Sequence, residues 1–148
     1  MGRAFALLIA LTSFCAPAAA QTKSGGIEVR EAWARVANGQ TSVYLTIVNH
    51  TGTDDALLSV TSPAADRLIL QKMSVKNLAA RRKGLASIGT PAMSATRLSP
   101  SAQYIAVEGL HEPLRPGQSI PVTLVFQHAG QIETVAPVGN QELGNRGR

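Results

Sequence analysis

The sequence predicts an all-β domain, built as an antiparallel sandwich or barrel of about seven to nine short strands. Beyond the N-terminal segment, no stretch of about ten residues shows the 3.6-residue apolar period of a helix. Short runs rich in β-branched residues instead alternate with turn signals, and the chain holds 13 Gly and 8 Pro. At 148 residues and 45% hydrophobic content, the chain is long enough to bury one core.

Residues 1–20 have the pattern of a cleavable signal peptide. A positive residue and an apolar stretch lead to the small residues Ala18–Ala20, a cleavage site before Gln21. The apolar stretch is shorter than the roughly 20 residues that span a membrane. Cys15 raises the alternative of lipidation, but Phe14 stands where lipoprotein processing favours a small residue. We therefore expect export to the periplasm or beyond, with no transmembrane segment left after cleavage.

The mature chain is expected to begin with a flexible leader over residues 21–26, followed by one domain over 27–138. The segment 27–36 alternates apolar and polar residues up to Trp33, which predicts a strand with one face in the core. The segment 41–49 is the clearest strand, because it is rich in β-branched and aromatic residues.

The second half of the domain follows the same pattern. A turn over 51–55 precedes a strand over 56–61, and 67–75 alternates again. Residues 76–83 are polar and basic, so a loop is predicted there. Further strands are predicted at 85–88, 95–98, 104–107, 120–127 and 131–138, and residues 139–148 are expected to form a flexible tail.

The sequence contains no catalytic constellation, and we expect that the protein is not an enzyme. The three histidines, His50, His111 and His128, lie at strand ends or turns and are not at metal-ligand spacing from one another. Glycine-rich phosphate loops are absent. The adjacent Asp54 and Asp55 fall in a turn, where they are expected to cap or solvate the backbone.

Positive charge is concentrated between Arg67 and Leu110, which hold seven Lys or Arg residues. Such a group suggests a patch for an anionic partner, either a periplasmic protein or an anionic surface. The alternative is that these charges only solvate one face of the domain. Nucleic acid is not expected as a partner, because aromatic residues do not interleave with the charges. The candidate patch consists of Arg67, Lys72, Lys76, Arg81, Arg82 and Lys83.

Four segments of the mature chain, taken in order, resemble one known family. They are AWAR (32–35), TIVNHTGTDDALLSVTSPAADRLIL (46–70), GLHEPLRPGQSIPVTLVF (109–126) and AGQIETVAPV (129–138). The resemblance is to the periplasmic copper chaperones of the PCu(A)C type, which are cupredoxin-like Greek-key β-sandwiches. It implies a Cu(I) site made by a histidine, a methionine after ten intervening residues, and His-x-Met after twenty-one more.

The resemblance places these ligand positions at Gln71, Arg82, Tyr104 and Ala106, with the family's spacing intact. None of the four side chains is a soft donor of the kind that selects Cu(I). Arginine is protonated and cannot coordinate a metal. We therefore expect a divergent member with no metal at the usual site and no other cofactor.

Two hypotheses remain open from the sequence. The first is a secreted, non-enzymatic binding protein that keeps the chaperone scaffold and docks a protein or an anionic partner. The alternative is a chaperone that holds Cu(I) through non-standard ligands, for which Met73 and His111 are the candidates.

Overall fold

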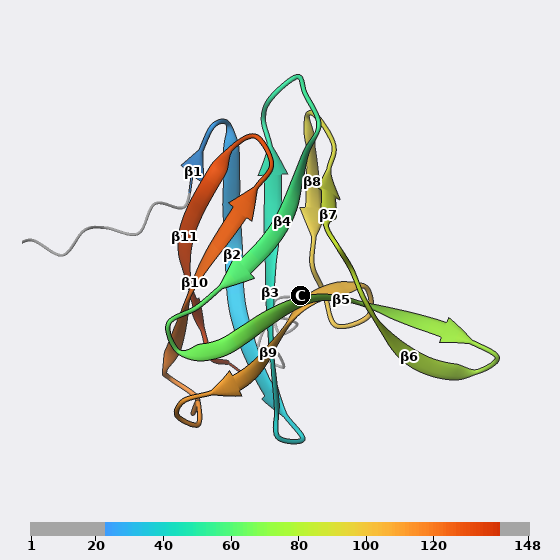
Figure 1. Cartoon of the computed structure of the whole chain (residues 1–148), viewed down its shortest axis with the longest axis vertical. Coiled ribbons are helices and arrows are strands. Elements are labelled where there is room, and N and C mark those ends of the chain that lie inside the picture. Colours follow the sequence, from blue (N-terminus) through green and yellow to red (C-terminus); the bar gives the residue numbers. More distant parts are fainter. Residues whose placement is uncertain (1–22, 140–148) are drawn as a thin grey trace, which may run out of the picture.

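The computed structural model describes residues 23–139, so the expected signal peptide and nearly all of the expected tail lie outside the described residues. Within this range the chain forms eleven strands and no helix, more strands than the sequence predicted. Two facing antiparallel sheets result, which confirms the all-β sandwich (Figure 1). The strands are β1 (Lys23–Ser24), β2 (Ile27–Ala37), β3 (Gln40–Asn49), β4 (Asp55–Thr61), β5 (Ala65–Lys76), β6 (Ala79–Gly84), β7 (Ile88–Thr90), β8 (Ser94–Arg97), β9 (Gln103–Leu110), β10 (Ser119–Phe126) and β11 (Gly130–Pro137).

The larger sheet has the order β1-β2-β3-β9-β5-β6, with β8 paired to the second half of β3, and the smaller sheet has the order β11-β10-β4-β7. Their inner faces meet in an aliphatic core that includes Leu45, Leu57, Ile105, Leu124 and Ile132, all fully buried. Burial of apolar surface stabilises such a core by roughly 25 cal/mol per Å². The tryptophan and both tyrosines do not belong to this core and lie on the outer face of the larger sheet.

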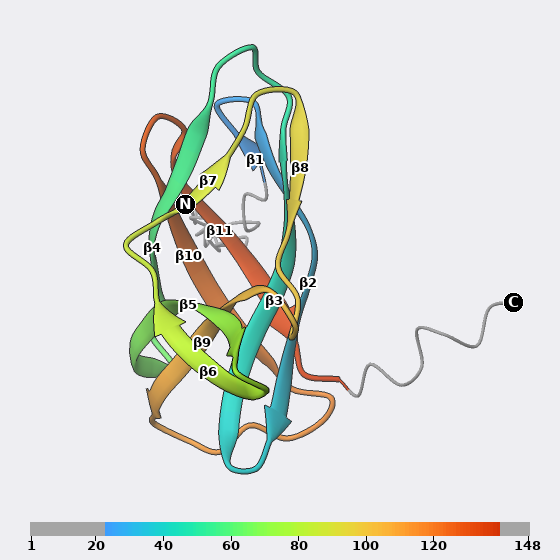
Figure 2. The ribbon, with the colours of Figure 1, turned by 90° about the vertical axis from the view of Figure 1, so that its right-hand side faces the viewer.

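The prediction of a loop over residues 76–83 is wrong. Residues Ala79–Gly84 form β6, which pairs with β5 through a turn of only two residues, Asn77 and Leu78. Both turn residues have positive φ, 53° and 63°, as two-residue hairpins favour. The hairpin projects from the body of the sandwich (Figures 1 and 2). Alanine and basic residues have low strand propensity, so composition did not reveal a strand that backbone pairing holds.

The expected inward face of β2 also changes along the strand. A β-bulge between Arg30 and Trp33 inserts one residue, with Glu31 at φ 51°. Side chains alternate with a period of two, so one extra residue exchanges the inner and outer faces beyond the bulge. Ala34 is consequently buried, whereas Trp33 and Arg35 lie on the outer face.

Two short segments differ from the sequence prediction as well. Part of the expected flexible leader forms β1, which pairs with the start of β2 across Gly25 and Gly26. Both glycines have positive φ, and a Cβ on Gly26 would collide with Thr51. The strand predicted over 85–88 starts only at its last residue and runs on as β7.

The described part of the chain includes no helix with the length and apolar character needed to cross a membrane.

Candidate functional site

Three aromatic rings form a row on the outer face of the larger sheet, across β2, β3 and β9. The ring centroids of Trp33 and Tyr44 lie 4.5 Å apart, and those of Tyr44 and Tyr104 lie 6.3 Å apart. Tilted aromatic pairs at such distances contribute about 0.5–1.5 kcal/mol beyond the area they bury. The row depends on the bulge in β2, because the bulge turns Trp33 outward.

Tyr104 and Gln71 are directly opposite each other on β9 and β5. The Tyr104 hydroxyl donates a hydrogen bond of 2.9 Å to the side-chain oxygen of Gln71. Tyr104 is only 4% exposed, so this bond satisfies a hydroxyl that has little access to water. Two of the four positions at which the resemblance implies ligands are therefore bonded to each other.

The structure brings all four of these positions together. Gln71, Arg82, Tyr104 and Ala106 line one small cavity of about 90 Å³, to which β5, β6 and β9 contribute. Arg82 reaches it because β6 folds back beside β5, where it pairs with Met73. The four side chains offer an amide, a guanidinium, a phenol and a methyl group, none of which is a soft donor.

The two candidate substitute ligands are not brought together. Met73 lies near the end of β5 and lines a larger cavity with Arg82 and Tyr104. His111 lies beside the start of β5, where its backbone N–H bonds to Ala64 and its ring lies 2.8 Å from the carboxylate of Asp66. The eight residue steps from Ala65 to Met73 extend about 26 Å at roughly 3.3 Å per step, far beyond the reach of one ion.

The six basic residues of the predicted patch are divided between two faces. In an antiparallel pair, opposite residues share a face; Lys72 pairs with Lys83, and Ser74 pairs with Arg81. Lys76 lies two residues beyond Ser74 and so joins them. These four exposed cations, Lys72, Lys76, Arg81 and Lys83, are called the basic face here.

The other two residues of the predicted patch lie elsewhere. Arg82 is on the opposite side of the hairpin, so its neighbours Arg81 and Lys83 point away from the cavity. Arg67 forms an ion pair with Glu108 on β9, with its Nε 3.1 Å from the carboxylate.

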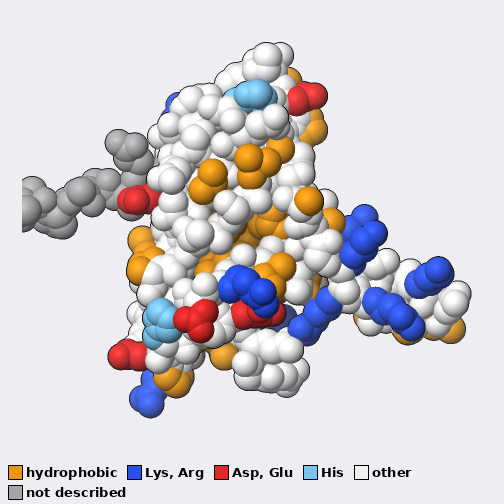
Figure 3. Space-filling view, viewed as in Figure 1, with side chains coloured by type: hydrophobic (Ala, Val, Ile, Leu, Met, Phe, Trp, Pro, Cys, Tyr) orange, Lys and Arg blue, Asp and Glu red, His pale blue; other side chains and the backbone are white. Residues whose placement is uncertain are grey.

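The hairpin carries exposed apolar residues at its outer end. Leu78 is fully exposed at the turn, and Val75 is 71% exposed. Within residues 23–139, none of the four cations of the basic face has a carboxylate within 4.0 Å. Figure 3 shows Lys and Arg side chains along the hairpin, without Asp or Glu on its visible surface. The projecting element is therefore both basic and apolar at the tip.

A larger cavity lies between this hairpin and the turn that joins β2 to β3. It has a volume of about 370 Å³, and Arg35, Asn38, Tyr44, Arg82 and Tyr104 are among its lining residues. Sequence reasoning did not single out Arg35 or Asn38. The one signal for Arg35 was its place in the AWAR segment. Its position on the outer face depends on a bulge that the sequence pattern does not reveal.

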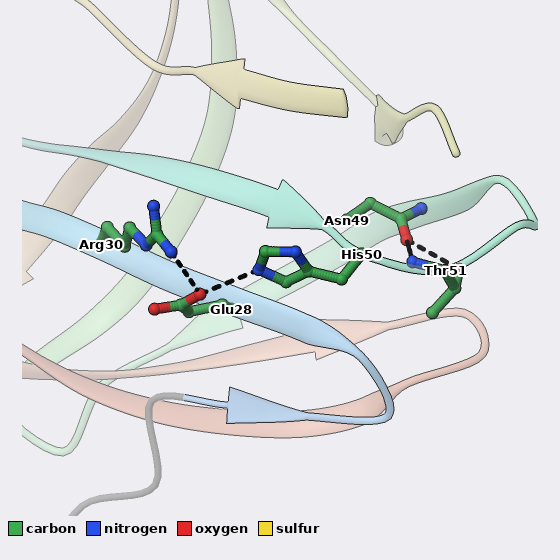
Figure 4. A network of polar contacts seen from close by, with 5 residues as sticks. All are labelled: Glu28, Arg30, Asn49, His50 and Thr51. Carbon is green, nitrogen blue, oxygen red and sulfur yellow. Dashed lines mark hydrogen bonds and ion pairs between the residues drawn. The ribbon is translucent and has the colours of Figure 1, made fainter. Parts of the chain in front are cut away.

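The three histidines lie apart and take part in local structure. The His50 ring is 2.9 Å from the Glu28 carboxylate, which also accepts a 2.8 Å bond from Arg30 (Figure 4). Hydrogen bonds from Arg30 and then His50 lower the pKa of Glu28 to about 2. In residues 23–139 no three His, Cys, Asp or Glu residues form a group that could hold a metal ion.

Asp54 ends the turn between β3 and β4, Asp55 is the first residue of β4, and both carboxylates cap backbone groups, as expected. Asp54 accepts the N–H of Ala92, and Asp55 accepts those of Ala56, His128 and Ala129 at 2.8–3.0 Å. Burial acts to raise the pKa of Asp55, but the three N–H donors outweigh it and hold the pKa below its ordinary value. Asp55 thus joins β4 to the β10–β11 turn.

Comparison with known proteins identifies the family. A family model described as "Putative lipoprotein LpqE-like" matches residues 27–138. "Putative lipoprotein Lxx21020" of Leifsonia xyli subsp. xyli (strain CTCB07) is 34% identical over 141 residues, covering 90% of this chain and 84% of that protein.

Solved structures with the same fold include PCuAC domains. The apo domain from PmoF1 has a TM-score of 0.68 and 27% identity over 80% of this chain and 98% of that domain. The copper-bound domain from PmoF2 has a TM-score of 0.67 and 21% identity, covering 80% and 96% of the two chains. The CuI form of DR1885 from Deinococcus radiodurans has a TM-score of 0.58 and 20% identity, covering 82% and 80%. The chain belongs to the LpqE-like family, and its fold is that of the PCuAC copper-chaperone domains.

Proposed function

We propose that this protein is a secreted, non-enzymatic binding protein that docks to an anionic surface and no longer uses the family's Cu(I) site. The projecting β5–β6 hairpin carries this proposal, because its basic face has no acidic partner among the described residues. An exported location is supported by the word "lipoprotein" in the names of the family and of the relative. We further propose that the signal peptide is cleaved before Gln21.

Loss of the usual copper site is supported by the state of the four positions. Gln71 and Tyr104 are engaged with each other, Arg82 brings a fixed positive charge, and Ala106 has no donor atom. Two unit charges about 5 Å apart at an effective dielectric near 20 repel by roughly 3 kcal/mol, about a hundredfold in affinity. The alternative site would need Met73, near the end of β5, and His111, beside the start of β5, to move together to bind one ion.

Anionic phospholipid is the partner that the hairpin fits best. Cations attract anionic headgroups by about 1 kcal/mol for each Lys or Arg near the surface. The fully exposed Leu78 at the tip adds apolar area that can enter the boundary between headgroups and acyl chains. An acidic protein would use the same cations but would have no need of a fully exposed leucine at the tip.

Vesicle sedimentation tests this proposal. We expect the mature protein to bind vesicles that contain phosphatidylglycerol and not vesicles of phosphatidylcholine alone, with binding that falls as salt rises. Substitution of Lys72, Arg81 and Lys83 by Gln should weaken binding about 100-fold. The matched control replaces Lys23, Arg97 and Arg115, which are also exposed, and removes the same charge. Equal loss in both triple variants, or no binding by the native chain, would overturn the proposal.

A further inference from the structure

We propose that the cavity of about 370 Å³ beside the β5–β6 hairpin binds a small organic oxyanion, a carboxylate or a phosphate. This inference goes beyond surface docking, because the cavity lies on the opposite side of the hairpin from the basic face. Its charged lining residues are Arg35 from β2 and Arg82 from β6, and no Asp or Glu lines it.

The two arginines are available to a ligand. Within residues 23–139, neither the Arg35 nor the Arg82 guanidinium has a carboxylate within 4.0 Å. Both guanidinium groups line the same cavity and no carboxylate lines it with them, so both attract an anion that enters it. Guanidinium groups also match the paired oxygens of carboxylates and phosphates in their hydrogen-bonding geometry.

The uncharged lining suits the same ligand class. Asn38, Gln40 and Ser42 supply amide and hydroxyl groups, and the rings of Tyr44 and Tyr104 also line the cavity. The volume lies within the roughly 300–1,000 Å³ range of small-molecule sites. A small anion with a few polar groups can therefore be held by the two arginines, one from β2 and one from β6, and by the neutral hydrogen-bonding groups of the same lining.

The β2 bulge builds this cavity at a cost in backbone strain. Glu31 has φ 51°, a conformation that L residues other than Asn and Asp rarely adopt. Without the inserted residue, Arg35 would turn to the inner face of the sheet, and a charge would enter the aliphatic core. The strained bulge thus directs one of the two arginines into the site, as bulges beside binding sites do.

Titration of the mature protein with succinate and with inorganic phosphate, followed by NMR, tests the proposal and separates the two oxyanion types. We expect saturable shifts for at least one anion, centred on the Tyr44, Tyr104 and Asn38 signals, and none with glycerol. Arg35→Gln and Arg82→Gln should each raise Kd by about 10–100-fold. Both arginines are exposed, so the variants should keep the native spectrum.

Arg97→Gln is the matched control, because Arg97 is an exposed arginine of the same sheet that does not line this cavity. It should leave the titration unchanged. The Lys72, Arg81 and Lys83 triple variant should also keep anion binding while it loses vesicle binding, which separates this inference from the proposed function. Unsaturable shifts with both anions, or an affinity that neither Arg35→Gln nor Arg82→Gln changes, would overturn it.

Discussion

The hydroxyl of Tyr104 bonds to the side-chain oxygen of Gln71 at 2.9 Å across β9 and β5. In the PCuAC resemblance these are two of the four ligand positions. In this protein the two side chains satisfy each other's hydrogen-bonding groups at a partly buried position. The pair therefore contributes to the stability of the fold.

Tyr104→Phe should lower the free energy of unfolding by about 1–2 kcal/mol, because it leaves the Gln71 oxygen without its donor. Urea denaturation of the native and variant chains measures this change. Replacing both residues, as Tyr104→Phe with Gln71→Met, should cost less than the sum of the two single changes. Strict additivity would mean that the hydrogen bond contributes nothing.

Asp55→Asn should destabilise the protein by about 1–3 kcal/mol, because an amide can no longer accept all three N–H groups. The pKa of Asp55 is lower in the folded protein than in the unfolded chain. Its contribution is therefore complete above the unfolded pKa of about 3.9 and is lost as pH falls through the folded pKa. Unfolding free energies measured across this range should fall less steeply in the variant than in the native chain. Equal slopes would contradict this role.

Leu78→Gly should separate stability from binding at the hairpin tip. Leu78 has φ 63°, which glycine adopts without steric cost, so the variant should be more stable by about 0.5–1 kcal/mol. Its affinity for vesicles with phosphatidylglycerol should nevertheless fall, because the apolar tip is gone.

Asn77→Gly is the control for the tip, since Asn77 also has positive φ in the same turn. It should keep vesicle binding intact. If Leu78→Gly binds as tightly as the native chain, the tip has no part in docking.

Mass spectrometry of the secreted protein tests the proposed processing. We expect a mature chain that starts at Gln21, and Cys15→Ser should be exported in the same form. A lipid-modified N-terminus at Cys15 would show that the residues before it are read as a lipoprotein signal despite Phe14.

The sequence predicted the sandwich because apolar alternation and turn residues are local signals. It placed β3 and β10 well, since these strands are rich in β-branched side chains, and it placed β4 well from an apolar run that turn residues bound on both sides. It missed β6, whose alanines and basic residues resemble a loop and whose pairing with β5 is visible only in three dimensions. It predicted one inward face for the segment 27–36 and did not reveal the bulge, because a single inserted residue near Glu31 exchanges the faces without any change in composition.

The candidate site was predictable only in part, for the same physical reason. The spacing of Gln71, Arg82, Tyr104 and Ala106 came from resemblance, and the structure places them around one cavity. The basic residues looked like one patch because they are close in the chain. Strand alternation then sends Arg82 to one side of the hairpin and Arg81 and Lys83 to the other.

The central claim is that the four ligand positions of the family still surround one cavity but no longer carry copper-binding side chains. A Cu(I) titration against a competing chelator tests this claim most directly. The native mature protein should bind Cu(I) no more tightly than micromolar. The quadruple variant Gln71→His, Arg82→Met, Tyr104→His and Ala106→Met should bind it far more tightly, because the four positions surround one cavity. Sub-nanomolar binding by the native chain, or a folded quadruple variant that still fails to bind Cu(I), would contradict the account.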